Sequence, residues 1–206
     1  LPPAVTAMTG VDAMVHAIEA YTTRLKKNPL SDALAVKALQ LLYANLPAAV
    51  SDGKDATVRE NMLLGSLFAG MAFANAPVGA VHALAYPLGG HYHLPHGLSN
   101  SLVLGPVLEF NLPAAQTLYA ELGRAIAPGA VSASDEVAAT IFVKSIRQLV
   151  ATMPYAQTLH EAGVKEADLP MLATDAMNVQ RLLVNNPRDV AYDDALAIYQ
   201  IGRAHV

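Results

Sequence analysis

One apolar stretch of the chain concentrates imidazole side chains. Four of the seven histidines, His82, His91, His93 and His96, fall within fifteen consecutive positions. An imidazole buried among apolar residues needs partners for its ring nitrogens, and neutral imidazole is the commonest protein ligand of metal ions. The stretch therefore indicates a metal site. The plainer alternative is a hydrogen-bonded core histidine at His82 and a histidine at a helix N-terminus at His96.

A carboxylate and an imidazole lie earlier in the chain at a helical spacing. Asp12 and His16 are four residues apart, so on a helix both side chains lie on one face, one above the other. Together they could bind one metal ion. Taken alone, such a pair is more often an ion pair, or a core histidine beside a capping residue, since Thr9 and Asp12 have capping-box spacing.

Two sets of metal ligands are open from the residues alone. One joins the Asp12–His16 pair to His82 and His96, which the intervening turn signals could bring to one point. The other takes His91, His93 and His96 from the loop, because alternate residues of an extended chain point to one side. The chain has no cysteine. Nitrogen and oxygen ligands of this kind suit Fe(II) or Zn(II).

The composition narrows the class of protein. The chain has 206 residues, of which 53% are hydrophobic and 15% charged, which fits a mostly helical, well-buried protein. A net charge of -4 without a basic cluster argues against nucleic acid as a partner. No phosphate-binding glycine loop and no serine in a nucleophile-elbow context is found. The lack of cysteine is compatible with a reducing cytoplasm, and the N-terminus does not read as a signal peptide.

An uncharged run from residue 62 to residue 90 is long enough to cross a membrane. Asn75-Ala76-Pro77 interrupts it, and His82 would be costly at the bilayer centre. We therefore expect a buried central helix pair and no membrane span.

Helical periodicity with turn signals predicts an all-α helical bundle of about eight to ten helices, since no segment alternates convincingly with period two. Gly89-Gly90 is expected to stop the helix that carries His82, and Asn111-Leu112-Pro113 to open a new helix. Helices are expected over about 10–23, 31–50, 55–74, 81–88, 96–110, 111–127, 134–153, 167–184 and 192–206.

Several of these stretches, taken in order, resemble signatures of the iron-containing (group III) alcohol dehydrogenases, and the resemblance runs from residue 1 to near residue 206. They are 10–19 (GVDAMVHAIE), 69–76 (AGMAFANA), His82 with 87–89 (PLG), 95–97 (PHG), 185–188 (NNPR) and 198–199 (IY).

The resemblance implies a fold and a ligand set. Residues 1–206 would be the helical, metal-binding catalytic domain at the C-terminus of the dehydroquinate-synthase-like fold, and the family's N-terminal α/β dinucleotide-binding domain would lie outside this chain. Phe73 falls where the family lines the substrate pocket. The family's metal ligands fall on Asp12, His16, His82 and His96.

The resemblance also implies an activity, namely reversible hydride transfer between a small primary or short-chain alcohol or aldehyde and NAD or NADP. Fe(II) or Zn(II) would act as a Lewis acid on the substrate oxygen. Many members have a second histidine, credited with proton relay, where this chain has Tyr86, so Tyr86 is the candidate for that role. Asp12 argues against the maleylacetate reductase relatives, which usually lack an acid there.

Three other readings stay open on the sequence. A Zn-dependent polyol or glycerol dehydrogenase relative would use an Asp and two His. A helical metal-binding domain without catalytic activity is a second alternative. Self-association into a homo-oligomer is the third open point, because the seam toward the missing domain could be apolar.

Overall fold

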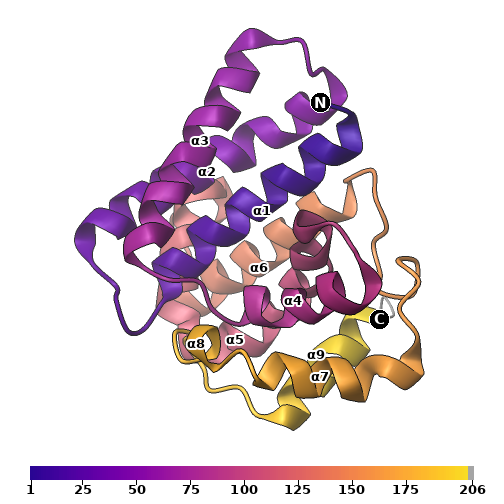
Figure 1. Cartoon of the computed structure of the whole chain (residues 1–206). Helices are drawn as coiled ribbons and strands as arrows, with labels where there is room; N and C mark the ends of the chain where they lie inside the picture. Colours follow the sequence, from indigo (N-terminus) through magenta and orange to yellow (C-terminus); the bar gives the residue numbers. More distant parts are fainter. Residues whose placement is uncertain (204–206) are drawn as a thin grey trace.

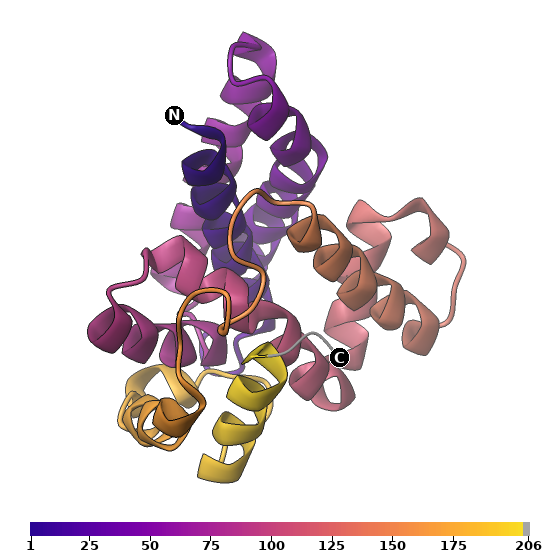
Figure 2. The same ribbon diagram turned by 90° about the vertical axis from the view of Figure 1, so that its right-hand side faces the viewer.

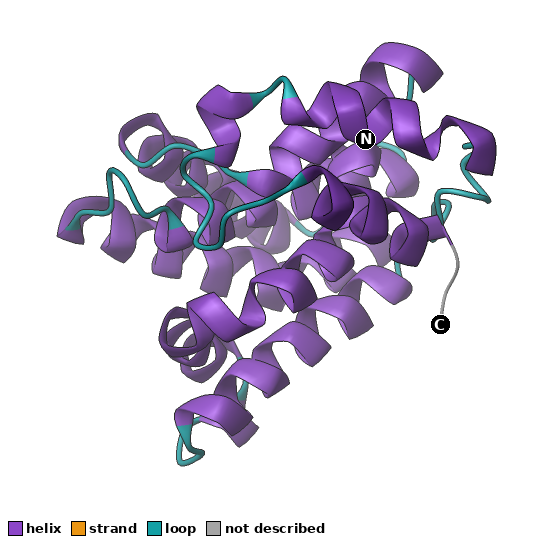
Figure 3. Ribbon diagram, turned by 90° about the horizontal axis from the view of Figure 1, so that it is seen from below, coloured by secondary structure: helices purple, strands orange, loops and turns teal. Residues whose placement is uncertain are grey.

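The computed structural model describes residues 1–203, which form nine α-helices and two short 3₁₀ turns and contain no β-strand (Figures 1 and 3). The prediction of an all-α bundle of eight to ten helices is confirmed. The helices are α1 (Pro3–Thr22), α2 (Pro29–Ser51), α3 (Ala56–Asn75), α4 (Ala80–Tyr92), α5 (His96–Ile126), α6 (Asp135–Ala151), α7 (Leu169–Met177), α8 (Gln180–Leu183) and α9 (Tyr192–Arg203).

Side-chain caps fix where three of the helices begin. The Asn28 side chain accepts a hydrogen bond from the Ser31 amide at the start of α2, where Pro29 occupies the first helical position. Asp55 caps α3 and Ser134 caps α6 in the same way. Each cap satisfies one of the amides that a helix start leaves without an intrahelical partner.

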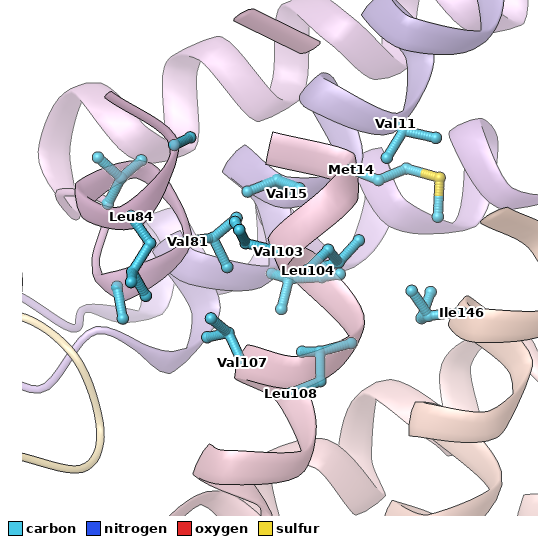
Figure 4. Packing of buried hydrophobic residues seen from close by; sticks show 14 of the residues in the cluster. Val11, Met14, Val15, Val81, Leu84, Val103, Leu104, Val107, Leu108 and Ile146 are labelled. Atoms are coloured by element: carbon cyan, nitrogen blue, oxygen red, sulfur yellow. The ribbon is translucent and has the colours of Figure 1, made fainter. Parts of the chain in front are cut away.

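The helices pack in two groups around α1 and α5. In Figure 1, α1, α2 and α3 form the upper part of the molecule, and α4 and α7–α9 lie below them. Figure 2 shows that the C-terminal half of α5 and α6 extend to one side. Buried side chains from α1, α4 and α5, among them Met14, Leu84 and Leu104, meet in one continuous core (Figure 4). That core holds the three helices that carry the candidate ligands.

Three expected helix ends are wrong. The first helix begins at Pro3, so Asp12 lies in mid-helix, and the Thr9 hydroxyl bonds back to the Val5 carbonyl instead of capping. Gly89-Gly90 does not stop α4, and α5 continues through Pro113. Glycine and proline weaken a helix locally, but burial of the flanking turns against other helices outweighs that cost.

The expectation that the apolar third helix is central is also wrong. Only Gly65, Ala69 and Ala72 of α3 are buried, so small residues face α1 and α2. The larger side chains of α3, such as Leu63 and Leu67, are exposed. Hydrophobicity all round a helix does not show which of its faces the rest of the chain covers.

The uncharged run is divided as expected, because α3 and α4 meet at 104° around residues 76–79. By length and hydropathy alone, α2 could cross a membrane. Within the described residues, however, α2 packs against α1, α3 and α5. A core helix of a bundle passes the same test.

Candidate metal centre

One carboxylate and three imidazoles converge at the point where α1, α4 and α5 meet. The four side chains each offer one ligand atom, and these atoms all lie within 4.8 Å of one another. Asp12 Oδ1 is 3.5 Å from His96 Nε2 and 4.0 Å from His82 Nε2, and Asp12 Oδ2 is 3.9 Å from His16 Nε2. The structure thus brings together all four residues of the inter-helix set.

Helix α1 supplies two of the four side chains from successive turns. Burial, together with the neighbouring His82 imidazole, lowers the pKa of His16 to about 4. The His16 ring is therefore neutral at pH 7 and retains a lone pair for a cation. Its Nδ1 atom is buried without a hydrogen-bond partner.

A buried carboxylate on α1 fixes the orientation of His82. His82 Nδ1 donates to Glu19 Oε2 at 2.6 Å, and the Val81 amide donates to Glu19 Oε1 at 2.7 Å. The residues Glu19 and His82 are only 6% and 2% exposed. Since Nδ1 carries the proton, Nε2 turns its lone pair toward Asp12 and the other imidazoles. Metal-ligating histidines in general depend on such a partner.

The PHG stretch places His96 beside α1. His96 is the first residue of α5, and the next residue, Gly97, lies directly against the backbone of Met8, one turn before Asp12. A Cβ added at Gly97 would stand 2.4 Å from the Met8 carbonyl oxygen, so only glycine fits this crossing. The absence of a side chain at Gly97 lets His96 approach Asp12.

Two aromatic side chains flank the cluster. The Phe73 ring on α3 stacks on His16 with centroids 4.3 Å apart. The Tyr86 ring lies one turn after His82 on α4, with its centroid 6.4 Å from His82 and 6.1 Å from His96. Tyr86 is 39% and Phe73 37% exposed, so both border the solvent side of the cluster.

The NNPR and IY stretches hold α4 in place from the C-terminal part of the chain. The Asn185 side chain donates to the Val78 carbonyl just before α4, and the Tyr199 hydroxyl donates to the Leu84 carbonyl within it. Asn186 exchanges two hydrogen bonds with Asn111 on α5. These stretches position His82 without touching it.

The rival ligand set in the loop is not assembled. His91 lies on α4 and bonds through Nε2 to Asp175 Oδ2 of α7 at 2.6 Å. His93 ends α4 in a left-handed conformation with φ of 53°. The two residues are therefore not on extended chain, because α4 runs on past Gly89-Gly90.

Two polar residues at the cluster were not predicted as site residues. Glu19 shares the face of α1 with Asp12 and His16, at a spacing of seven and three residues, and an acid in so apolar a segment is a usable signal. Asn100 is fully buried on α5, and its Nδ2 lies 2.5 Å from Asp12 Oδ1. It follows His96 by four residues, so it shares that ligand's helix face.

The donor set fits a divalent transition metal ion. One carboxylate oxygen and neutral imidazole nitrogens are the ligands that Fe(II) and Zn(II) take in proteins. The buried atoms His16 Nδ1 and Asn100 Oδ1 have no hydrogen-bond partner, but His16 faces Asp12 through Nε2 and Asn100 faces it through Nδ2. The set includes the oriented His82 that a metal centre requires.

Comparison with known proteins places the chain in a family. The long-chain-alcohol dehydrogenase 1 of Geobacillus thermodenitrificans is 39% identical over 97% of this chain and 50% of that protein. The 1,3-propanediol dehydrogenase of Citrobacter freundii is 41% identical over 91% of this chain and 48% of that protein. A crystal structure of a 1,3-propanediol oxidoreductase superposes with a TM-score of 0.92 at 38% identity, covering 98% of this chain and 52% of that one.

The chain thus spans about half the length of the curated relatives it matches. Residues 6–201 match the model of the C-terminal part of one family, which takes in every stretch on which the resemblance was based. The chain therefore belongs to the Fe-containing alcohol dehydrogenase family.

Proposed function

We propose that this chain is the metal-binding part of an NAD(P)-dependent alcohol dehydrogenase that interconverts small alcohols and aldehydes. The observation that supports this function is the convergence of Asp12, His16, His82 and His96 within one 4.8 Å cluster. Membership of the Fe-containing alcohol dehydrogenase family supports the proposed reaction class, the interconversion of alcohols and aldehydes. Substrate, cofactor and activity of the whole protein are part of the proposal, since the chain spans half of its relatives.

Each ligand contributes a definable property to the centre. A divalent ion, when bound, supplies Lewis-acid chemistry at the alcohol or carbonyl oxygen. Asp12 carries the only negative charge among the four ligands, so the ligand set leaves a divalent centre net positive. Glu19 keeps the lone pair of His82 directed inward through the Nδ1 hydrogen bond.

We propose that Phe73 and Tyr86 border the substrate-binding side of the metal centre, where Phe73 lines the pocket and Tyr86 transfers a proton. Phe73 packs on His16 and thereby limits the space beside it. The centroid of the Tyr86 ring lies 6.1 Å from that of His96 and 5.9 Å from the Arg181 guanidinium. Tyr86 is our candidate proton carrier, because a tyrosine hydroxyl can both donate and accept.

The ligand assignment is tested by the metal content of the Asp12→Ala variant. The chain is purified anaerobically, reconstituted with Fe(II) or Zn(II), and its bound metal is measured. We expect about one ion per chain in the wild type and loss of that ion in the variant, because the only anionic ligand is gone.

The Asp175→Ala variant is the matched control. It removes an acid that is paired with a histidine of the rival set, His91, and should leave the metal content unchanged. Metal retained by the Asp12 variant and lost by the Asp175 variant would contradict the ligand assignment. The metal found in the whole protein after anaerobic purification, and the activity that Fe(II) or Zn(II) restores to it, distinguish an iron enzyme from the zinc-dependent polyol or glycerol dehydrogenase alternative.

A further inference from the structure

One guanidinium stands near the exposed side of the candidate metal centre. The Arg181 guanidinium lies 5.9 Å from the centroid of the Tyr86 ring, which is within the range of a cation–π contact. The centroid of the Tyr86 ring lies 6.1 Å from that of His96. Among the four ligands, the His96 side chain is the most exposed, at 48%, and that of His82 is the least, at 2%. A substrate therefore reaches the centre on the side that Tyr86 borders, with Arg181 beside it.

The backbone of Arg181 is anchored to α4. Arg181 belongs to α8, whose two leucines are buried. The Asn185 side chain donates to the Arg181 carbonyl at 3.1 Å and to the Val78 carbonyl, just before α4, at 3.0 Å. Arg181 is thus tied to the helix that carries Tyr86, so its place near the cluster is set by the fold.

The charge of Arg181 has no partner of opposite sign within the described residues. Arginines elsewhere in the chain form ion pairs with carboxylates, namely Arg24, Arg124, Arg147 and Arg203. Arg181 forms no such pair in residues 1–203, and it is exposed. A guanidinium offers several N–H donors in a planar fork that matches the two oxygens of a carboxylate. This fork is therefore available to an anion that approaches from solvent.

The charges around the cluster favour a substrate that is itself negative. Asp12 is the only anion among the four ligands, so the centre is net positive when a divalent ion is bound. Arg181 adds a second positive charge on the side from which substrate enters, and like charges along one path attract an anion. A short aldehyde with a carboxylate at its other end can direct its reactive end to the cluster and its carboxylate to Arg181.

We propose that Arg181 determines substrate specificity by binding a carboxylate, and that the substrates are short aldehydes and alcohols that carry a carboxylate at the end remote from the reacting carbon. The carboxylate accepts charge-assisted hydrogen bonds from the guanidinium, which are stronger than those between neutral groups. This inference rests on the proposed function and adds a substrate class to it.

The test compares butanal with succinic semialdehyde, which has the same number of carbons and a terminal carboxylate. The whole metal-loaded protein is assayed with NADH and with NADPH. We expect kcat/KM to be about tenfold or more higher for succinic semialdehyde, and Arg181→Gln to lower that value about 10- to 100-fold, mainly through KM. Arg181→Lys keeps the charge without the fork and should retain part of the preference. Arg124→Gln, which disrupts the pair with Asp135, is the control and should keep the full preference.

Calorimetric titration of the same proteins with both aldehydes, without nicotinamide, measures binding alone. Arg181→Gln should raise the Kd of succinic semialdehyde far more than that of butanal. A wild type that prefers butanal, or a preference for the semialdehyde that Arg181→Gln leaves intact, would overturn the inference but not the proposed function. An equal loss for both aldehydes would do the same, because it indicates a structural role. A metal-loaded protein that reduces no short aldehyde would overturn both.

Discussion

The Glu19 carboxylate holds His82 in the tautomer that a metal ion needs. Glu19→Gln keeps the size of the side chain and an acceptor for the Val81 amide, but its amide nitrogen cannot accept from His82 Nδ1. We expect Zn(II) affinity to fall about 10- to 100-fold, as is typical for loss of an outer hydrogen-bond partner of a ligating histidine. Competition with a chelator measures the change.

Glu121→Gln is the appropriate comparison for this substitution. Glu121 accepts a hydrogen bond from the Tyr21 hydroxyl at 2.6 Å and does not touch the cluster. Its substitution should leave the Zn(II) affinity within about twofold of the wild-type value. If both glutamine variants bind equally well, Glu19 has no role in orienting His82.

At the residue scale, the spacing of residues in the sequence identified candidate ligands, but it did not show which other side chains they contact. Asp12 and His16 were found because four residues make one helical turn. The choice of His82 over His91 and His93 came from the family resemblance, since either set was physically acceptable. Asn100 was missed because a buried asparagine on a helix is usually satisfied by local hydrogen bonds, and only the fold shows what lies opposite it.

At the scale of elements, the crossing of α1 and α5 sets the distance between Asp12 and His96. Gly97→Ala would drive a Cβ into the Met8 carbonyl, so α5 must shift away from α1. We expect a loss of about 1–3 kcal/mol in the free energy of unfolding and weaker Zn(II) binding. Denaturant titration and chelator competition on the same preparations measure the two effects.

Gly90→Ala provides the contrast on a neighbouring helix. Gly90 lies within α4, and a Cβ there would meet nothing within 4 Å. The substitution should be neutral or stabilise the protein by about 0.5–1 kcal/mol, as for glycine in a helix interior. A Gly97 variant as stable as the Gly90 variant would show that the crossing tolerates a side chain.

The helices themselves were predictable from periodicity, but their ends and environments were not. Proline and glycine signals placed false breaks at Gly89-Gly90 and Pro113, because the gain from tertiary packing outweighs local propensity. The exposure of α3 could not be predicted from the sequence either, because a uniformly apolar helix has the same sequence pattern whether or not the rest of the chain covers it. The 104° bend after α3 was signalled correctly by Pro77.

At the scale of the molecule, the cluster links three helices, so metal binding and folding are coupled. An ion that binds only the folded chain adds about 2.7 kcal/mol of stability at one hundred times its Kd. We expect saturating Zn(II) to raise the melting temperature of the wild type and EDTA to reverse the rise. The Asp12→Ala variant should melt at the same temperature with and without Zn(II), and a full shift in that variant would place the ion elsewhere.

The isolated 206-residue chain should not turn over NAD(P) with alcohols. Within residues 1–203 there is no β-sheet of the kind that holds a dinucleotide in α/β proteins. We expect metal binding without measurable NAD(P)H formation when Fe(II) or Zn(II) and short-chain alcohols are supplied. Appreciable turnover by the purified chain would show that the cofactor is held by these helices.

Exposure changes steeply across the four ligands, from 2% for the His82 side chain to 48% for that of His96. The His82 side is closed by packed helices, so incoming ions and outgoing ions must pass on the His96 side. The rate at which a chelator strips the centre should therefore depend on the bond to His96 more than on the bond to His82. The lifetime of the metal-loaded protein would then depend on the exposed His96 side of the cluster, even though the burial that stabilises the centre lies on the His82 side.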